Sequence, residues 1–180
     1  MVLAAAKIVL MVIAWRDFRD EEYRIPRQIL EKAGYQVEVV STQTGIATGM
    51  LGLKVSVGKN LNDVKSQNFD GLILVGGSGT TSLYENKKLH LLIQEFVRQK
   101  KPVGAICLAP VILAKAGVLQ GKKATVYVSA AELLKQAGVI YSAEEVVTDG
   151  LIVTGNGPSA AGNFATAFLN LLQRTGPDKP

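Results

Sequence analysis

The sequence predicts an α/β protein with a mostly parallel central sheet that is covered by helices on both faces. Short runs that are apolar at nearly every position alternate with amphipathic stretches, as strands buried on both faces alternate with helices. Glycines follow several of the amphipathic stretches, where helices commonly end. The chain has 180 residues, 48% of them hydrophobic, and no linker rich in proline, glycine or serine. We therefore expect a single domain over residues 1–180.

The first half of the chain is expected to alternate strands with helices around one glycine-rich hairpin. The expected elements are a strand at 7–14, a helix at 21–33, a strand at 36–41, a small hairpin at 45–58 on the edge of the sheet, a strand at 71–75 and a helix at 86–99. Gly34 directly follows the first of these helices, which is the usual position of a glycine that ends a helix.

The second half of the chain continues the same alternation. The expected elements are a strand at 102–106, a helix at 108–116, two hairpin strands at 145–148 and 151–154, and a closing helix at about 159–172. Asp149 and Gly150 supply the turn of the hairpin. Gly117 and Gly138 mark the ends of two helices.

The only cysteine, Cys107, falls on the turn between the strand at 102–106 and the helix at 108–116. A sharp turn from a strand into a helix holds a side chain exposed at the carboxyl end of a sheet. The first N–H groups of the helix are free there to stabilise a thiolate or an oxyanion. A lone cysteine is more often an inert core residue, but this position favours a nucleophile. We expect the pKa of its thiol to lie below that of a free cysteine.

Two glycine-rich segments follow expected strands, and neither has the spacing of a nucleotide-binding motif. In GGSGTTS, at 76–82, Gly76 and Gly77 instead allow the backbone to approach a neighbouring reactive atom closely. The segment GNGPSAAG, at 155–162, predicts a tight turn and the start of a helix. The single histidine, His90, cannot form a multi-histidine metal site. We therefore expect no cofactor and no metal.

The net charge of +5 comes from lysines and arginines that are scattered along the chain without aromatic residues between them. No nucleic-acid-binding motif accompanies them, so we expect no nucleic-acid partner. The apolar run from Ile8 to Trp15 is too short to span a bilayer, and we expect no membrane association. A chain with one cysteine forms no intrachain disulfide, which is consistent with the cytoplasm.

Four segments carry a resemblance to a known family, and they run in the family's order over nearly the whole chain. They are EEYRIP followed by LEKAG, then FDGLILVGGSG, KPVGAICLAPVILAKAGVLQGKKAT and VVTDGLIVTGNGPSAAGNFA. With these segments the chain resembles the ThiJ/PfpI superfamily, which includes the Parkinson-linked protein deglycase and PfpI-type intracellular proteases and is related to class I glutamine amidotransferase domains. The resemblance implies a flavodoxin-like three-layer sandwich and a homodimer or higher oligomer.

By this resemblance Cys107 corresponds to the family's nucleophile and Glu22 to the acid that contacts it. The N–H groups of Gly77 and Leu108 correspond to the oxyanion site. An ionised carboxylate beside the sulfur would repel a thiolate, so Glu22 must be protonated when Cys107 is ionised. The two groups then share a proton, which Glu22 can move to or from a substrate. An exposed thiolate would also be prone to oxidation.

The chain departs from its relatives at two positions that matter for function. Peptidase-like members carry a histidine directly after the nucleophile, where this chain has Leu108. Glyoxalase-type members also use a histidine, and the comparable stretch here offers Tyr127, which donates hydrogen bonds but is a poor base near neutral pH.

The sequence therefore favours an enzyme that acts on small reactive carbonyl compounds or their adducts through a hemithioacetal on Cys107. Two alternatives stay open. One is a PfpI-like cysteine peptidase with a peptide substrate, and the other is a non-enzymatic, redox-responsive chaperone or sensor.

Overall fold

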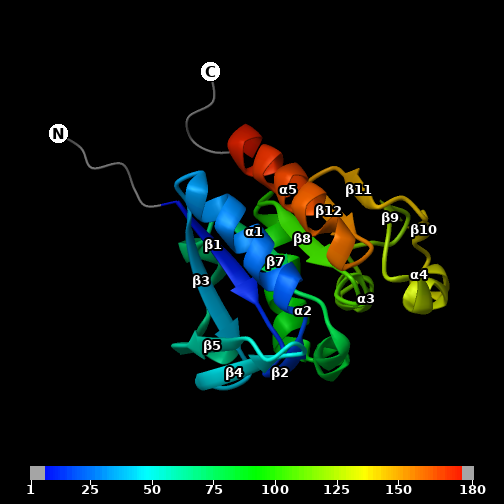
Figure 1. Ribbon diagram of the computed structural model, residues 1–180. Helices are drawn as coiled ribbons and strands as arrows, with labels where there is room; N and C mark the ends of the chain where they lie inside the picture. Colours follow the sequence, from blue (N-terminus) through cyan, green and yellow to red (C-terminus); the bar gives the residue numbers. More distant parts are fainter. Residues whose placement is uncertain (1–6, 176–180) are drawn as a thin grey trace.

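The computed structural model describes residues 7–175, which form a seven-stranded central sheet with the order β11–β12–β8–β7–β1–β3–β6 (Figure 1). Neighbouring strands are parallel except β11, which runs antiparallel to β12. The strands are β1 (Ile8–Val12), β3 (Gln36–Ser41), β6 (Lys59–Asn60), β7 (Gly71–Leu74), β8 (Val103–Ile106), β11 (Val146–Asp149) and β12 (Ile152–Gly155). The predicted α/β class with a mostly parallel sheet is confirmed.

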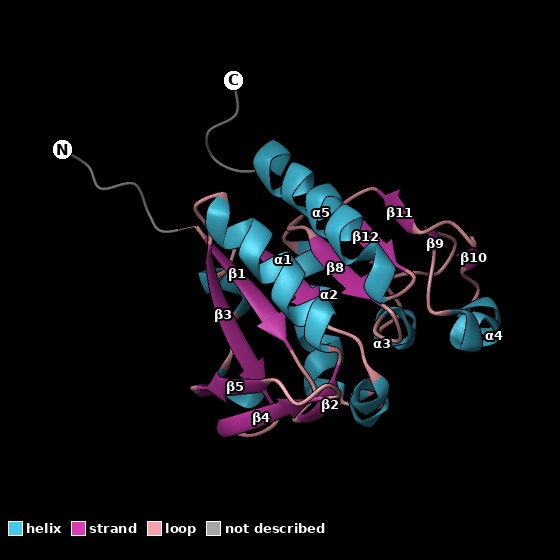
Figure 2. Cartoon of the chain, viewed as in Figure 1, coloured by secondary structure: helices cyan, strands magenta, loops and turns pink. Residues whose placement is uncertain are grey.

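Helices cover both faces of this sheet (Figure 2). Helices α1 (Asp20–Lys32) and α5 (Ala161–Thr175) pack against each other on one face, in front of the strands in Figure 1. On the other face, α2 (Lys87–Arg98) contacts β7 and β8, and α3 (Pro110–Lys115) packs against α2. The arrangement is a flavodoxin-like three-layer sandwich. None of the helices within residues 7–175 is long and apolar enough to cross a membrane.

Helix α5 lies close to the sheet because two strands carry glycine where its aromatic rings pack. A Cβ at Gly104 of β8 would lie 2.8 Å from the ring of Phe164. A Cβ at Gly71 of β7 would lie 2.9 Å from the ring of Phe168. Both phenylalanines are fully buried. Because interiors are close-packed, this contact holds β7 and β8, whose carboxyl ends lead into the loops described below.

The hairpin predicted at 45–58 forms, but its predicted place on the edge of the central sheet is wrong. Strands β4 (Gly45–Gly49) and β5 (Lys54–Val57) pair antiparallel, and β2 (Arg16–Phe18) joins β4 to complete a separate three-stranded sheet. The edge position beside β3 belongs to β6. With only three residues, β2 is too short to show a strand pattern, so its pairing was not predictable.

The other predicted strands and helices are confirmed, with ends displaced by a few residues. Gly34, Gly117 and Gly138 adopt φ angles of +89°, +79° and +75°, as expected for glycines that end helices. A small sheet of two parallel two-residue strands, β9 (Lys123–Ala124) and β10 (Ile140–Tyr141), was not predicted. Helix α4 (Ala131–Gln136) lies between these strands in the chain, and only the glycine that ends it was recognised.

Candidate active site

Cys107 lies on the turn between β8 and α3, at the carboxyl edge of the central sheet. Its backbone has a φ of 62°, in the left-handed region that costs a residue with a Cβ about 1–2 kcal/mol. The Cys107 N–H donates to the carbonyl of Gly155, and its own carbonyl accepts from the N–H of Tyr127, both at 2.9 Å. A strained backbone persists only where its surroundings hold it, so these two bonds fix the direction of the thiol.

Glu22 faces Cys107 across Gly76. It belongs to the first turn of α1 and is fully buried. A Cβ built on Gly76 would lie 2.5 Å from the Cβ of Cys107 and 2.5 Å from Oε2 of Glu22. Such distances leave no room for a side chain at position 76. Glycine at this position therefore allows the carboxyl group and the thiol to meet.

Burial raises the pKa of Glu22 from 4.5 to about 8. Neither of its carboxyl oxygens makes a hydrogen bond of ordinary geometry within residues 7–175. The Cys107 thiol, the charge of Arg19 and the N–H of Gly76 lower this pKa, but by less than burial raises it. The N-terminal position in α1 also favours the anion, typically by at most about 1 kcal/mol at a surface, whereas full burial shifts pKa values by up to about 3–5 units. Glu22 is therefore mostly protonated at neutral pH.

The pKa of Cys107 is raised to about 12, so the expectation of a lowered pKa was wrong. The largest cause is burial, since the residue is only 7% exposed, and the charge of Glu22 is the next. The backbone N–H groups of Gly77 and Leu108 act on the sulfur in the opposite direction. A lowered pKa was expected from these donors alone. The burial of the sulfur, which raises the pKa, depends on distant parts of the chain.

A pocket of about 370 Å³ opens onto Cys107. This is within the size range of small-molecule sites. It is lined by Arg19, Met50, Gly77, Ser78, Cys107, Leu108, Tyr127, Ser129 and Pro158. Leu108 and Tyr127, which the sequence singled out, lie in its wall, and Tyr127 is 44% exposed. Glu22 and Gly76 are buried and do not line the pocket.

Arg19 is a cation of this pocket that the sequence analysis did not single out. Its Nε and Nη2 atoms donate to the carboxylate of Glu21 at 2.7 and 3.0 Å. Its backbone N–H donates to the carbonyl of Gly76 at 2.8 Å. This bond connects the start of α1 to the segment 76–82 that follows β7, which we call the glycine loop. Several charged residues follow the first strand, and nothing local to the sequence distinguishes this one. Met50, Ser78 and Pro158 were missed for the same reason, because the pocket gathers them from distant loops.

His90 takes no part in the pocket. It is buried, and its Nε2 lies 2.9 Å from the carbonyl oxygen of Tyr84. Across residues 7–175, no three histidine, cysteine, aspartate or glutamate side chains gather as metal ligands.

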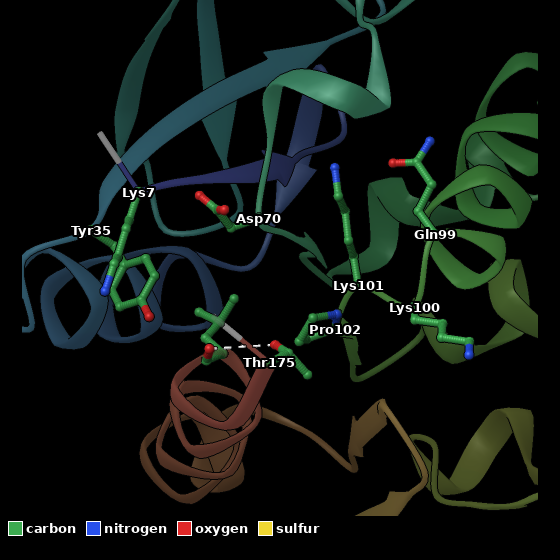
Figure 3. Close-up of a pocket in the computed structure, with 9 residues that line it drawn as sticks. Lys7, Tyr35, Asp70, Gln99, Lys100, Lys101, Pro102 and Thr175 are labelled. Carbon is green, nitrogen blue, oxygen red and sulfur yellow. Dashed lines mark hydrogen bonds between the residues drawn. The ribbon is translucent and has the colours of Figure 1, made fainter. Parts of the chain in front are cut away.

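A second pocket, of about 180 Å³, lies at the opposite edge of the central sheet, where β1, β7 and β8 begin (Figure 3). Its polar groups serve the fold. The carboxylate of Asp70 accepts from the N–H of Ile8 at 2.7 Å, and the ammonium group of Lys101 donates to the carbonyl of Ser66 at 2.9 Å. The pocket's lining contains no nucleophilic thiol, so we place the candidate chemistry at Cys107.

The protein is a flavodoxin-like sandwich in which a cysteine on a strained strand-to-helix turn faces a buried glutamate. These features define a class of proteins, and comparison with known families identifies that class. The sequence matches the DJ-1/PfpI family over residues 7–171. The chain therefore belongs to the DJ-1/PfpI family, which confirms the resemblance to the ThiJ/PfpI superfamily.

Three individual relatives illustrate the membership. Deglycase PfpI of Pyrococcus furiosus is 32% identical over 164 residues, covering 91% of this chain and 99% of that protein. The Bacillus subtilis protein YraA, whose name proposes a cysteine protease, is 36% identical over 163 residues, covering 90% and 96%. The crystal structure of a ThiJ/PfpI domain protein from Brachyspira murdochii matches with a TM-score of 0.92 at 31% identity, covering 95% of this chain and 99% of that one.

Proposed function

We propose that this protein is a cysteine-dependent enzyme that acts on small reactive carbonyl compounds or their adducts. The observation that carries the proposal is the pairing of a thiol on a strained turn with a protonated, fully buried carboxyl group across Gly76. The names of relatives support it, since several are called deglycases. The pocket above the sulfur has the volume for a small molecule.

The proposed reaction begins with the shared proton on Glu22 and the negative charge on Cys107. The thiolate sulfur attacks the carbonyl carbon, a C–S bond forms, and the electron pair of the C=O bond moves to oxygen. The N–H groups of Gly77 and Leu108, which favour negative charge at the sulfur, are proposed to hold this oxygen. Glu22 then gives its proton to the oxygen, which completes a neutral hemithioacetal and leaves a carboxylate that can accept a proton in the next step.

A cysteine peptidase is the second candidate, supported by the name of YraA. The usual partner of such a nucleophile is a histidine, and the chain has only one, His90. It is buried, bonded to the carbonyl of Tyr84 and absent from the pocket lining. A single copy of the chain therefore lacks the base that peptide hydrolysis needs, unless another subunit supplies one.

A substrate panel tests these candidates. Methylglyoxal, a glycated amino acid and an unmodified peptide are each incubated with wild type, Cys107→Ser and Glu22→Gln. We expect turnover of the first or second substrate by wild type and loss of it in both variants, with no peptide cleavage. Tyr127→Phe serves as a control for the pocket wall, because it removes only the hydroxyl group. No turnover of any substrate, with suppression of client aggregation by the oxidised protein, would instead support the chaperone or sensor alternative.

A further inference from the structure

Met50 lies in the wall of the Cys107 pocket, on the turn between β4 and β5. It is 41% exposed, whereas Met11 of β1 is fully buried. Thioether sulfur is oxidised to the sulfoxide where it is accessible. Between these two methionines, only Met50 is open to a soluble oxidant.

The backbone around Met50 is held in place. Its N–H donates to the carbonyl of Phe18 at 2.9 Å. The carboxylate of Asp20 accepts from the N–H groups of Leu51 and Leu53 at 2.9 and 2.8 Å. The space for this carboxylate exists because position 49 is glycine, where a Cβ would lie within 3 Å of it. The methionine is therefore presented to the pocket by a fixed turn.

The sulfur of Met50 is also linked to the glycine loop. The backbone N–H of Ser78 donates to its Sδ, at 3.5 Å. Ser78 directly follows Gly77, whose own N–H faces the sulfur of Cys107. The N–H that contacts the thioether, on Ser78, is therefore adjacent in the chain to the N–H that faces the nucleophile, on Gly77.

We propose that Met50 is a site of reversible oxidation by hydrogen peroxide, and that its sulfoxide restricts access to Cys107. A lone pair of Sδ attacks one peroxide oxygen, the O–O bond breaks, and the products are methionine sulfoxide and water. The new S=O oxygen is a far better hydrogen-bond acceptor than a thioether sulfur. The oxygen therefore accepts the hydrogen bond that the N–H of Ser78 donates. The added oxygen makes the side chain larger and polar in the wall of the pocket. This inference concerns access to the thiol and does not depend on which substrate the protein uses.

The experiment must separate oxidation of Met50 from oxidation of Cys107. Cys107 is first capped as a methylthio disulfide, the protein is treated with hydrogen peroxide, and the thiol is regenerated with dithiothreitol, which leaves sulfoxides intact. The masses of two tryptic peptides are then measured by mass spectrometry: peptide 33–54, which contains Met50, and peptide 8–16, which contains Met11. The alkylation rate of Cys107 is measured with iodoacetamide and with a bulkier maleimide, before and after oxidation.

We expect peptide 33–54 to gain one oxygen atom and peptide 8–16 to gain none. Alkylation should slow by about tenfold, which corresponds to a barrier about 1.4 kcal/mol higher, and more for the maleimide than for iodoacetamide. A methionine sulfoxide reductase should restore the rate. In Met50→Leu, which keeps a side chain of similar size without sulfur, the rate before peroxide treatment should equal the rate after it.

Three results would overturn the proposal. If peptide 33–54 gains no oxygen under conditions that oxidise free methionine, Met50 is not a modification site. If it gains oxygen and the alkylation rates stay the same, the sulfoxide does not restrict access to Cys107. An equal loss of rate in wild type and in Met50→Leu would assign the effect to another residue.

Discussion

Replacing Glu22 with glutamine should change the shape of the titration curve of Cys107. A carboxylate and a thiolate about 4 Å apart repel each other by about 4 kcal/mol at an effective dielectric constant of about 20. This corresponds to a factor of about 1,000 in the acid dissociation constant of the thiol. We expect the wild-type pair to lose its first proton near pH 8, mostly from Glu22, and its second near pH 12. The thiolate fraction should therefore rise to a plateau near pH 8 and become complete only near pH 12.

The variant removes one member of the pair, so Cys107 should titrate once, about 3 pH units below the upper step of wild type. Iodoacetamide alkylation between pH 6 and pH 11 measures this. We expect similar rates near neutral pH and a rate about tenfold higher for the variant near pH 10. Glu21→Gln is the matched control and should keep the low wild-type rate near pH 10, because Glu21 is partly exposed and paired with Arg19. A single step at the same pH in wild type and Glu22→Gln would refute the coupled pair.

Four further expectations follow from the same geometry. The pKa of Glu22 is about 8 in the folded state, above its ordinary value of 4.5. Its contribution to stability is therefore complete below about pH 4.5 and is lost as the pH rises through 8. Over that range the free energy of unfolding, measured by urea titration, should fall by a few kcal/mol in wild type and stay constant in Glu22→Gln. Gly76→Ala should destabilise the protein and disturb the Glu22–Cys107 contact, whereas Gly162→Ala in α5, where a Cβ meets nothing within 4 Å, should leave stability equal or higher by about 0.5–1 kcal/mol. Light scattering at micromolar concentration should give the mass of a homodimer, consistent with the exposed Ile46, Leu51, Val128 and Ile140; a monomer would contradict this, and a trimer or hexamer would favour the peptidase candidate. Leu108→His should raise peptide cleavage and Tyr127→His methylglyoxal turnover, and no gain in either would show that the family histidines are not what limits activity.

The sequence predicted the features that depend on neighbours in the chain. The strand, turn and helix around Cys107 lie within about fifteen consecutive residues. Apolar runs and glycines in that stretch therefore suffice to place the cysteine at the sheet edge. The wall of the pocket could not be predicted in this way. Met50 reaches it through the small β2–β4–β5 sheet, and Pro158 reaches it from the turn after β12.

The pKa values of the site likewise divide into an effect that could be predicted from the residue types and one that depends on the packed structure. The sequence predicted that Glu22 must be protonated beside a thiolate, which needs only like-charge repulsion. It did not predict the high pKa of the thiol, because that depends on how deeply the sulfur is buried. Burial is a property of the whole packed structure, and no local pattern reports it.

The small sheet and the glycine loop together explain how an acid on α1 reaches a thiol on the turn that follows β8. A Cβ on Gly77 would lie 2.4 Å from the carbonyl oxygen of Asp17, and one on Gly79 would lie 1.8 Å from that of Arg16. The loop and the chain of β2 are thus in backbone contact, and β2 leads directly into the first turn of α1. Because no side chain separates these layers, a change in the position of β2 moves Glu22 relative to Cys107. The buried side of the site is therefore constrained by packing, whereas Tyr127 in the wall of the pocket is 44% exposed and is less constrained by its neighbours.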